Sequence, residues 1–482
     1  MERGPTIALL VDHPERDLPG LVLTAVELCR RGATCHLVPA NLAWKEIWAL
    51  VPDFTLFNYF RRSNEPLGRS LAEAGLAFGV LDTEGGVWSD FRAYTELLWS
   101  DESLRRQAAC FCAWGHRMAD HLIEERWFSP DQVVVTGCPR FDFYHPEWRP
   151  VVDVYGFERD GAAPQVLLNT NFSTRNPRFA TVEQKIETSM RNFGWTLERI
   201  RALLDTEEQA IEAFIQLARR LARERPDCRV LVRPHPFEDP TWYKRALSDQ
   251  SNITVDNDGP VQPVLFASAA VVQRSCTTGI EAGLAGRPTF SPQWVDAPWL
   301  MPTAEAVSVP CATYEEVAEG IGAVLDRRFV PEPSVTAAIQ EVVNDWFCSA
   351  DGGSHGRVAE AVLKSVPSRS PTTGARAARH LYLADAAGVP LTGASAIGGR
   401  LRLAARLSPD FSFRAMGNRP ALSWTRTPKY FDVARVQALA DRVVAVDQQR
   451  AGGMPAVRAE AARDGMDNRY GLHMHAVTLS RS

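Results

Sequence analysis

Short apolar segments alternate with helical patterns along most of the chain, and this alternation constrains the fold more than any other feature of the sequence. Apolar runs of about four to eight residues bounded by turn residues are typical of buried strands. Strands that alternate with helices form βαβ units and parallel sheets. The expected strands fall into two series, at 6–12, 33–39, 53–59, 77–82, 109–115 and 132–137, and then at 164–171, 228–236, 252–257, 269–275 and 288–292. We therefore predict an α/β protein with two Rossmann-like, doubly wound parallel-sheet domains that face a cleft.

The length of 482 residues also favours more than one domain. A polar, proline-containing stretch at 144–164 marks a boundary, so we predict an N-terminal domain at 1–150 and a second domain at 160–366. Residues 367–482 form a C-terminal extension rich in Arg, Ala and Gly, with a net charge of +9 against −14 for the preceding part of the chain. We interpret the extension as a variable appendage containing one helix at 429–446. The alternative is a basic face toward an anionic membrane surface or an acidic glycan.

Composition excludes several classes of protein. No run approaches the roughly 18 apolar residues of a membrane span. The N-terminal apolar run is too short for a secretory signal. The nine cysteines are scattered, without the spacing of a zinc site. We expect a cytoplasmic protein that has no metal site and no nucleic-acid partner.

The turn that begins "RSCTTG" at Arg274 predicts an anion site. Ser275, Thr277, Thr278 and Gly279 lie where a buried strand leads into a helix. A helix N-terminus presents unpaired N–H groups and the positive end of the helix dipole, which suits a phosphate. One hydroxyl would be enough for capping, whereas three with a glycine indicate a cradle for an anion. The P-loop pattern is absent.

Two further strand ends in the second series carry polar side chains. The segment "RPHP" places Arg233 and His235 after a strand, with prolines that fix the backbone around the imidazole. A histidine held in this way can donate to a phosphate or protonate a leaving group. Asn169 and Asn171 follow the strand at the start of the same series. Glu281 lies one turn into the helix after the hydroxyl-rich turn, where it could accept hydrogen bonds from ribose hydroxyls.

In the first series, "VLDTEGG" places Asp82 and Glu84 at a strand end before two glycines. Neighbouring carboxylates suit acid–base catalysis because like charges perturb each other's ionisation. The glycines allow a substrate to approach the backbone, although the same letters also form an ordinary turn. Arg16 and Asp17 follow the first strand, and we expect them to contact an acceptor. In open parallel sheets ligands bind beyond the carboxyl ends of the strands, where all these residues are expected.

The chain resembles the bacterial surface carbohydrate biosynthesis proteins, which look like GT-B glycosyltransferases. The matching stretches are "DTEGG", "VTGCPRFD", "LLNTNFS", "RPHPFED", "CTTGIEAGLAGRP" and "WFCSADGGSHGRVAEAVL". The resemblance ends near residue 366. It implies a GT-B fold and a cytoplasmic glycosyltransferase that acts in the synthesis of lipopolysaccharide, capsule or a related glycoconjugate.

A looser resemblance, to sialyltransferases and Kdo transferases, concerns the donor substrate. Those enzymes use CMP-activated ulosonic acids and share the order of acidic motif, "HP" and Ser/Thr pair. The resemblance implies that Glu84 or Asp82 is the catalytic carboxylate, that His235 stabilises the departing CMP phosphate, and that the turn at 275–278 cradles it. It further implies a metal-independent reaction that needs no cofactor beyond the nucleotide-sugar donor.

Two alternatives remain open at the level of sequence. One is a different nucleotide-sugar enzyme on the same scaffold, either a CDP-polyol phosphotransferase or a UDP-sugar 2-epimerase. The other is a catalytically silent scaffold protein of a polysaccharide assembly complex. The variant Glu84→Gln would distinguish an enzyme from a binding protein. An enzyme should lose activity in this variant while nucleotide binding persists.

Overall fold

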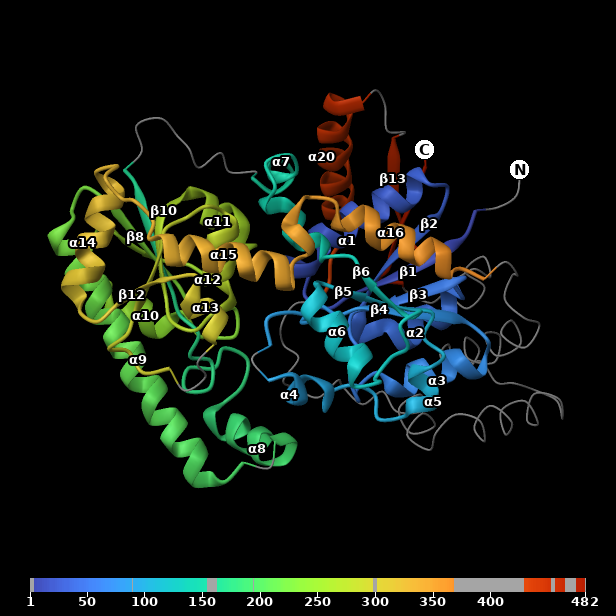
Figure 1. Ribbon diagram of the computed structural model, residues 1–482, viewed down its shortest axis with the longest axis horizontal. Coiled ribbons are helices and arrows are strands. Elements are labelled where there is room, and N and C mark those ends of the chain that lie inside the picture. Colours follow the sequence, from blue (N-terminus) through green and yellow to red (C-terminus); the bar gives the residue numbers. More distant parts are fainter. Residues whose placement is uncertain are drawn as a thin grey trace. The chain divides into compact units, whose positions relative to one another are not determined.

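The computed structural model describes residues 4–88, 90–153, 163–193, 195–297, 301–367, 429–451, 456–463 and 474–481 (Figure 1). These residues divide into two compact units. The first contains Met1–Val151 together with the described residues from Asn344 onward, and the second contains Val152–Val343. Among the described helices, none is both long and apolar enough to cross a membrane.

The first unit is built on an eight-stranded sheet in the order β13-β14-β2-β1-β3-β4-β5-β6. Six strands run parallel: β1 (Thr6–Val11), β2 (Thr34–Pro39), β3 (Phe54–Phe57), β4 (Ala77–Leu81), β5 (Cys110–Ala113) and β6 (Val133–Val135). All six residues of β1 are buried, as expected for a central strand covered on both faces. The antiparallel strands β13 (Val457–Ala461) and β14 (Val477–Arg481) extend the sheet beyond β2.

The helices of this part of the chain are α1 (Pro14–Arg30), η1 (Ala40–Leu42), α2 (Ala43–Leu50), α3 (Glu65–Glu73), α4 (Phe91–Thr95), α5 (Glu102–Arg105), α6 (His116–Glu124), η2 (Pro139–Tyr144), α7 (Arg149–Val152), η3 (Cys348–Ala350), α16 (Ser354–Ser365) and α20 (Val433–Ala451). Helix α1 is buried along most of its length because it packs against α16, α20 and η2 as well as the sheet. Gly20 allows the approach of η2, since a Cβ atom there would lie 2.7 Å from the backbone nitrogen of Arg140.

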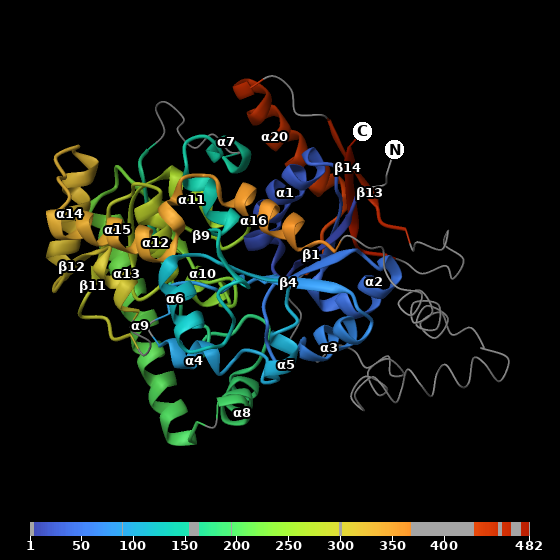
Figure 2. The ribbon, with the colours of Figure 1, turned by 45° about the vertical axis from the view of Figure 1, so that its right-hand side comes forward.

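The C-terminal segment, which we define as the described residues from 429 onward, is part of the first unit. Helix α20 packs on α1, and β14 pairs with β2 through the register Val477↔Leu37 (Figures 1 and 2). Leu479 is completely buried and its carbonyl accepts a hydrogen bond from the Cys29 thiol. The segment therefore covers the β2 edge of the parallel strands and one side of α1.

The second unit contains a six-stranded sheet in the order β12-β11-β10-β7-β8-β9, in which every pair is parallel. The strands are β7 (Gln165–Asn169), β8 (Arg229–Arg233), β9 (Ile253–Val255), β10 (Ser268–Gln273), β11 (Thr289–Pro292) and β12 (Val309–Cys311). The helices are α8 (Val182–Phe193), α9 (Leu197–Glu224), α10 (Thr241–Ala246), α11 (Val261–Ala267), α12 (Thr277–Leu284), α13 (Pro302–Ala306), α14 (Tyr314–Leu325) and α15 (Pro333–Trp346). The long helix α9 packs a row of apolar side chains, including Phe214 and Leu221, into the core formed with β7 and β8.

The structure confirms the predicted α/β fold with two parallel-sheet units and the predicted strands of both series. The facing cleft stays a prediction. The division of the chain differs from the predicted domains, because α16 contacts α1, β4 and β5 of the first unit instead of joining the second. The helix predicted at 429–446 is present as α20. The part of the predicted extension at 368–428 lies outside the described residues.

Candidate functional site

Three of the predicted motifs meet at one edge of the second sheet. Asn169 at the end of β7 is in register with Arg233 at the end of β8 and with Gln273 at the end of β10. Because the strands are parallel, the segments that follow these residues emerge side by side at the carboxyl edge of the sheet. The tertiary structure therefore brings together "NTNFS", "RPHP" and "SCTTG", which are far apart in the sequence.

The turn between β10 and α12 is held by hydrogen bonds to the segment that follows. Ser275 adopts a left-handed backbone conformation, with φ of 55°. Its N–H donates to Glu305 Oε1 (2.9 Å), while the other oxygen of Glu305 pairs with Arg274. The Ser275 hydroxyl accepts a hydrogen bond from the backbone N–H of Met301. Ser275 and Arg274 thus shape the turn, and Thr277 is exposed as the first residue of α12.

Other residues of this turn are packed tightly. The Cys276 N–H donates to Gln273 Oε1 (2.8 Å), and Asn169 Nδ2 donates to Cys276 Sγ (3.4 Å). A Cβ atom on Gly279 would lie 2.8 Å from the Gln273 side chain, so glycine is needed for this close approach. Thr278 is buried, as is Glu281. Of the three predicted hydroxyls, the one on Thr277 is therefore the one presented to solvent.

His235 is held in one orientation just after the end of β8. Its Nδ1 accepts a hydrogen bond from the Phe237 N–H (3.2 Å), and the two rings stack at 5.5 Å. A neutral imidazole whose Nδ1 accepts carries its proton on Nε2. The His235 N–H donates to Glu238 Oε1 (3.0 Å). In this tautomer Nε2–H is the donor group of the ring.

Glu238 anchors this loop from inside the unit. It is fully buried and accepts hydrogen bonds from Thr170 Oγ1 and from the Tyr243 hydroxyl, both at 2.8 Å. Burial raises the pKa of Glu238, because desolvation disfavours the carboxylate. The sequence analysis did not single out Glu238, although it lies three residues after His235.

The remaining predicted nucleotide-binding residues occupy different environments. Arg233 is 4% exposed, and its guanidinium donates to the carbonyls of Asp258 (3.0 Å) and Gly259 (2.5 Å), which fastens the loop after β9. Asn171 is exposed just beyond β7. The predicted role of these residues in phosphate binding stays a prediction.

In the first unit, Asp82 lies at the centre of a buried hydrogen-bond network. Its carboxylate pairs with Arg61 (2.7 Å) and accepts from the Tyr94 hydroxyl (2.9 Å). It also accepts from the Glu84 N–H (2.8 Å), and its carbonyl accepts from Trp114 Nε1 (2.7 Å). Asp82 has no exposed surface, and its hydrogen bonds fix the turn that carries Glu84.

Glu84 is the exposed member of the predicted pair. Its side chain is 55% exposed and lies 3.5 Å from Arg16 Nη1. Arg16 also contacts Asp17 (2.7 Å) and Asp12 (3.3 Å). Burial alone would lower the pKa of Arg16, but the attraction of Asp17 and the hydrogen bond to it raise that pKa overall. Lys429 of the C-terminal segment contacts the other carboxylate oxygen of Asp12, Oδ1, at 2.7 Å.

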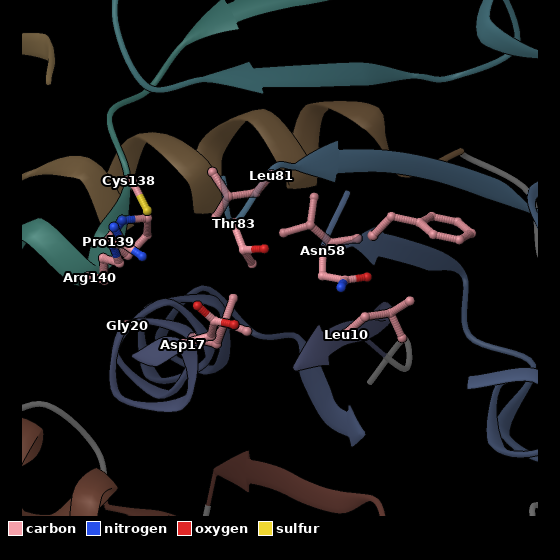
Figure 3. A pocket seen from close by; sticks show the side chains of 12 residues that line it. Leu10, Asp17, Gly20, Asn58, Leu81, Thr83, Cys138, Pro139 and Arg140 are labelled. Carbon is pink, nitrogen blue, oxygen red and sulfur yellow. The ribbon is translucent and has the colours of Figure 1, made fainter. Parts of the chain in front are cut away.

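A pocket at the carboxyl ends of β1, β3 and β4 lies beside these residues (Figure 3). Its cavity volume is small, about 20 Å³, and it opens to solvent. Its lining consists of Leu10, Asp17, Gly20, Leu21, Leu56, Phe57, Asn58, Leu81, Thr83, Cys138, Pro139 and Arg140. The sequence analysis found Asp17 but missed Asn58 and Thr83, although both follow apolar strands and satisfy the same rule that identified Glu84.

Within the described ranges, no group of three His, Cys, Asp or Glu side chains could hold a metal ion. That the reaction needs no metal stays a prediction.

No family model and no curated protein sequence matches the chain. Solved structures with a similar fold include a putative UDP-N-acetylglucosamine 2-epimerase from Listeria monocytogenes, with 12% identity and a TM-score of 0.47, covering 77% of this chain and 98% of the other. The UDP-GlcNAc 2-epimerase from Neisseria meningitidis bound to UDP-GlcNAc has 12% identity and a TM-score of 0.46, covering 74% and 99%. The wall teichoic acid polymerase TagF has 11% identity and a TM-score of 0.46, covering 76% and 90%. Similarity at this level does not assign an activity.

Proposed function

We propose that the protein is a glycosyltransferase that transfers a sugar from a nucleotide donor to a hydroxyl group of a glycan acceptor. The observation that carries this proposal is the register of Asn169, Arg233 and Gln273. It brings the turn before α12 and the oriented imidazole of His235 to the same edge of the sheet, on either side of the segment that follows β7. An exposed hydroxyl on the first residue of α12 and a fixed Nε2–H donor suit the phosphate of a nucleotide.

In the proposed reaction, the acceptor oxygen forms a bond to the anomeric carbon of the donor sugar as the bond from that carbon to the phosphate oxygen breaks. The nucleotide leaves with the electron pair, and the Nε2–H of His235 stabilises the new charge on its phosphate. Glu84 takes the proton of the acceptor hydroxyl, which its exposure permits. Arg16 holds the carboxylate of Glu84, and Asp82 fixes the backbone of the turn.

The donor that we propose is a CMP-activated ulosonic acid. Such a donor carries its phosphate on an anomeric carbon that also bears a carboxylate, so it needs N–H and cationic donors around the phosphate. The support for this donor is the order of the acidic, "HP" and Ser/Thr motifs. On the sequence resemblance we propose bacterial surface glycans as the acceptors. From the scattered cysteines we propose a cytoplasmic enzyme, and from the basic charge of residues 367–482 a peripheral contact with the anionic surface of the inner membrane.

Thermal shift against CMP, CDP, UMP, UDP and GDP tests the proposal. A ligand that binds only the folded state raises the melting temperature by mass action. We expect CMP to stabilise the wild type and the control His116→Gln, in which an exposed histidine outside the second unit is replaced, and to have little effect on His235→Gln. A preference for UDP would instead favour a UDP-sugar 2-epimerase, and a preference for CDP a CDP-polyol phosphotransferase. No response to any nucleotide would contradict the proposal and favour a catalytically silent scaffold.

A further inference from the structure

The buried carboxylate of Glu238 closes the loop that carries His235. The His235 N–H donates to Glu238 Oε1 (3.0 Å), and the Glu238 N–H donates in turn to the His235 carbonyl (2.7 Å). The two prolines of "RPHP" have no N–H groups, and the Phe237 N–H donates to the imidazole. All backbone donors of residues 234–238 are therefore used within the loop, and its shape depends on the Glu238 side chain.

The same carboxylate oxygen ties this loop to the neighbouring strand. Thr170, which directly follows β7, donates its hydroxyl to Glu238 Oε1 (2.8 Å). The preceding residue, Asn169, donates from Nδ2 to the sulfur of Cys276, the N-cap of α12 (3.4 Å). Because β7 lies between β8 and β10, these two consecutive residues reach in opposite directions along the edge of the sheet. A continuous series of contacts therefore links His235 to the turn before α12.

A carboxylate at this position is costly for stability. Glu238 has no exposed surface, and burial raises its pKa because desolvation disfavours the charged form. Its second oxygen accepts from the Tyr243 hydroxyl (2.8 Å). A buried charged group often stabilises a protein less than an apolar side chain of similar size, but a satisfied polar network fixes one geometry. What Glu238 supplies is a fixed geometry between the two segments that it joins.

We infer that Glu238 is a positioning residue, which sets the separation between the imidazole of His235 and the N-terminus of α12. It acts through the His235 N–H on one side and through Thr170 on the other. The inference rests on the proposed function in one respect, since it takes the space between the imidazole and α12 as the place of the donor phosphate. A phosphate that bonds to both groups requires them at the correct separation, so loosening either link should weaken nucleotide binding.

Four variants of the full chain separate positioning from support of the fold. Glu238→Leu removes both links, and Thr170→Val removes only the link to β7. Glu238→Gln keeps an acceptor oxygen for both donors, so it is the conservative replacement. The matched control is Tyr243→Phe, which removes a buried hydrogen bond from the other oxygen of the same carboxylate and leaves both links in place.

Three measurements are made on each variant. Isothermal titration calorimetry gives the affinities for CMP, CDP, UMP, UDP and GDP, and thermal melting records the loss of stability. NMR of protein labelled with ¹⁵N in its histidine rings gives the tautomer of His235, whose signals are assigned by their absence from His235→Gln. The tautomer is observed without a nucleotide, so it reports on Glu238 independently of the proposed function.

We expect Glu238→Leu to bind the preferred nucleotide roughly tenfold more weakly than the wild type, which is the equivalent of one hydrogen bond, and to lose the single Nε2–H tautomer of His235. Thr170→Val should bind more weakly but keep that tautomer, because the His235 N–H stays bonded to Glu238. Glu238→Gln and Tyr243→Phe should match the wild type in affinity and tautomer, although Tyr243→Phe should melt at a lower temperature.

Unchanged affinity and an unchanged tautomer in Glu238→Leu would overturn the inference and leave the proposed function in place. A loss of affinity in Tyr243→Phe as large as that in Glu238→Leu would also overturn it, since both residues would then act through the fold. If Glu238→Leu does not fold, Thr170→Val decides, and unchanged affinity in that variant would overturn the inference.

The absence of binding by every nucleotide to the wild type would remove the proposed function. The tautomer of His235 would then decide the inference on its own. A mixture of tautomers in Glu238→Leu, with a single tautomer in Tyr243→Phe, would support positioning of the imidazole by Glu238. A single Nε2–H tautomer in both variants would overturn it.

Discussion

Lys429 Nζ lies 2.7 Å from Asp12 Oδ1, joining two residues that are 417 positions apart in the sequence. Asp12 in turn contacts Arg16, which contacts Glu84. The C-terminal segment therefore reaches the same cluster of charges that surrounds the proposed catalytic carboxylate.

Replacing Lys429 by Met should lower the free energy of unfolding by roughly 1 kcal/mol, because the pair is partly buried and Asp12 would lose a cation. A double-mutant cycle with Asp12→Asn in urea denaturation measures the coupling. The control Lys364→Met breaks an exposed pair with Glu360 and should have a smaller effect. Zero coupling between Lys429 and Asp12 would mean that this contact does not stabilise the unit.

Replacing Leu479 by Ala should destabilise the first unit by about 2–5 kcal/mol, because the side chain is completely buried in β14 against the sheet. Urea denaturation gives the change in free energy. Val330→Ala, at an 81% exposed position, serves as the control and should stay within about 0.5 kcal/mol. If Leu479→Ala were as stable as this control, the C-terminal segment would not contribute to the core.

The two carboxylates of "DTEGG" should respond differently to amide substitution. Asp82→Asn leaves Arg61 without its buried partner and should lower stability by about 3–5 kcal/mol. Glu84→Gln should change stability little, since Glu84 is exposed, while abolishing the proposed transfer. Melting temperatures and nucleotide binding of both variants measure the contrast. A large loss of stability in Glu84→Gln would identify a structural role for that residue instead.

Glu207 should make the stability of the second unit depend on pH. Burial raises the pKa of Glu207 from an ordinary value of 4.5 to about 7, although its carboxylate accepts hydrogen bonds from the Thr174 and Arg175 N–H groups. Because the folded state holds its proton more tightly, this contribution to stability is fully present below pH 4.5 and is lost as the pH rises to about 7. The loss amounts to roughly 3 kcal/mol.

Glu207→Gln should remove this dependence, since the amide keeps an acceptor oxygen without a charge. Urea denaturation between pH 4.5 and 8 compares the variant with the wild type and with Glu187→Gln, an exposed position on α8. Parallel pH curves for Glu207→Gln and the wild type would contradict the assignment of this effect to Glu207.

Much of the architecture follows from local pattern alone. The apolar runs at β1, β7 and β10 are long, continuous and bounded by turn residues, so they indicate buried strands of parallel sheets without knowledge of the tertiary structure. The rule that ligands bind at the carboxyl ends of such strands also identified the segments around Glu84 and His235.

By contrast, β13 and β14 were not predicted. They alternate small, polar and apolar residues in a segment whose composition resembles a linker. They form strands because β14 pairs with the edge of β2 and β13 pairs with β14. The sequence likewise did not predict that α16 belongs to the first unit, because its amphipathic pattern would fit either unit.

The sequence by itself determined the class of fold, the two series of strands and the strand ends at which chemistry is expected, because these depend on residues close together in the chain. Only the tertiary structure decided which carboxylate of the pair Asp82 and Glu84 is buried, and that Lys429 reaches Asp12. It also decided that Thr83 and Asn58 face one pocket. The physical reason is that burial, ion pairing and unsatisfied hydrogen bonds are set by contacts between segments distant in sequence, which periodicity does not record.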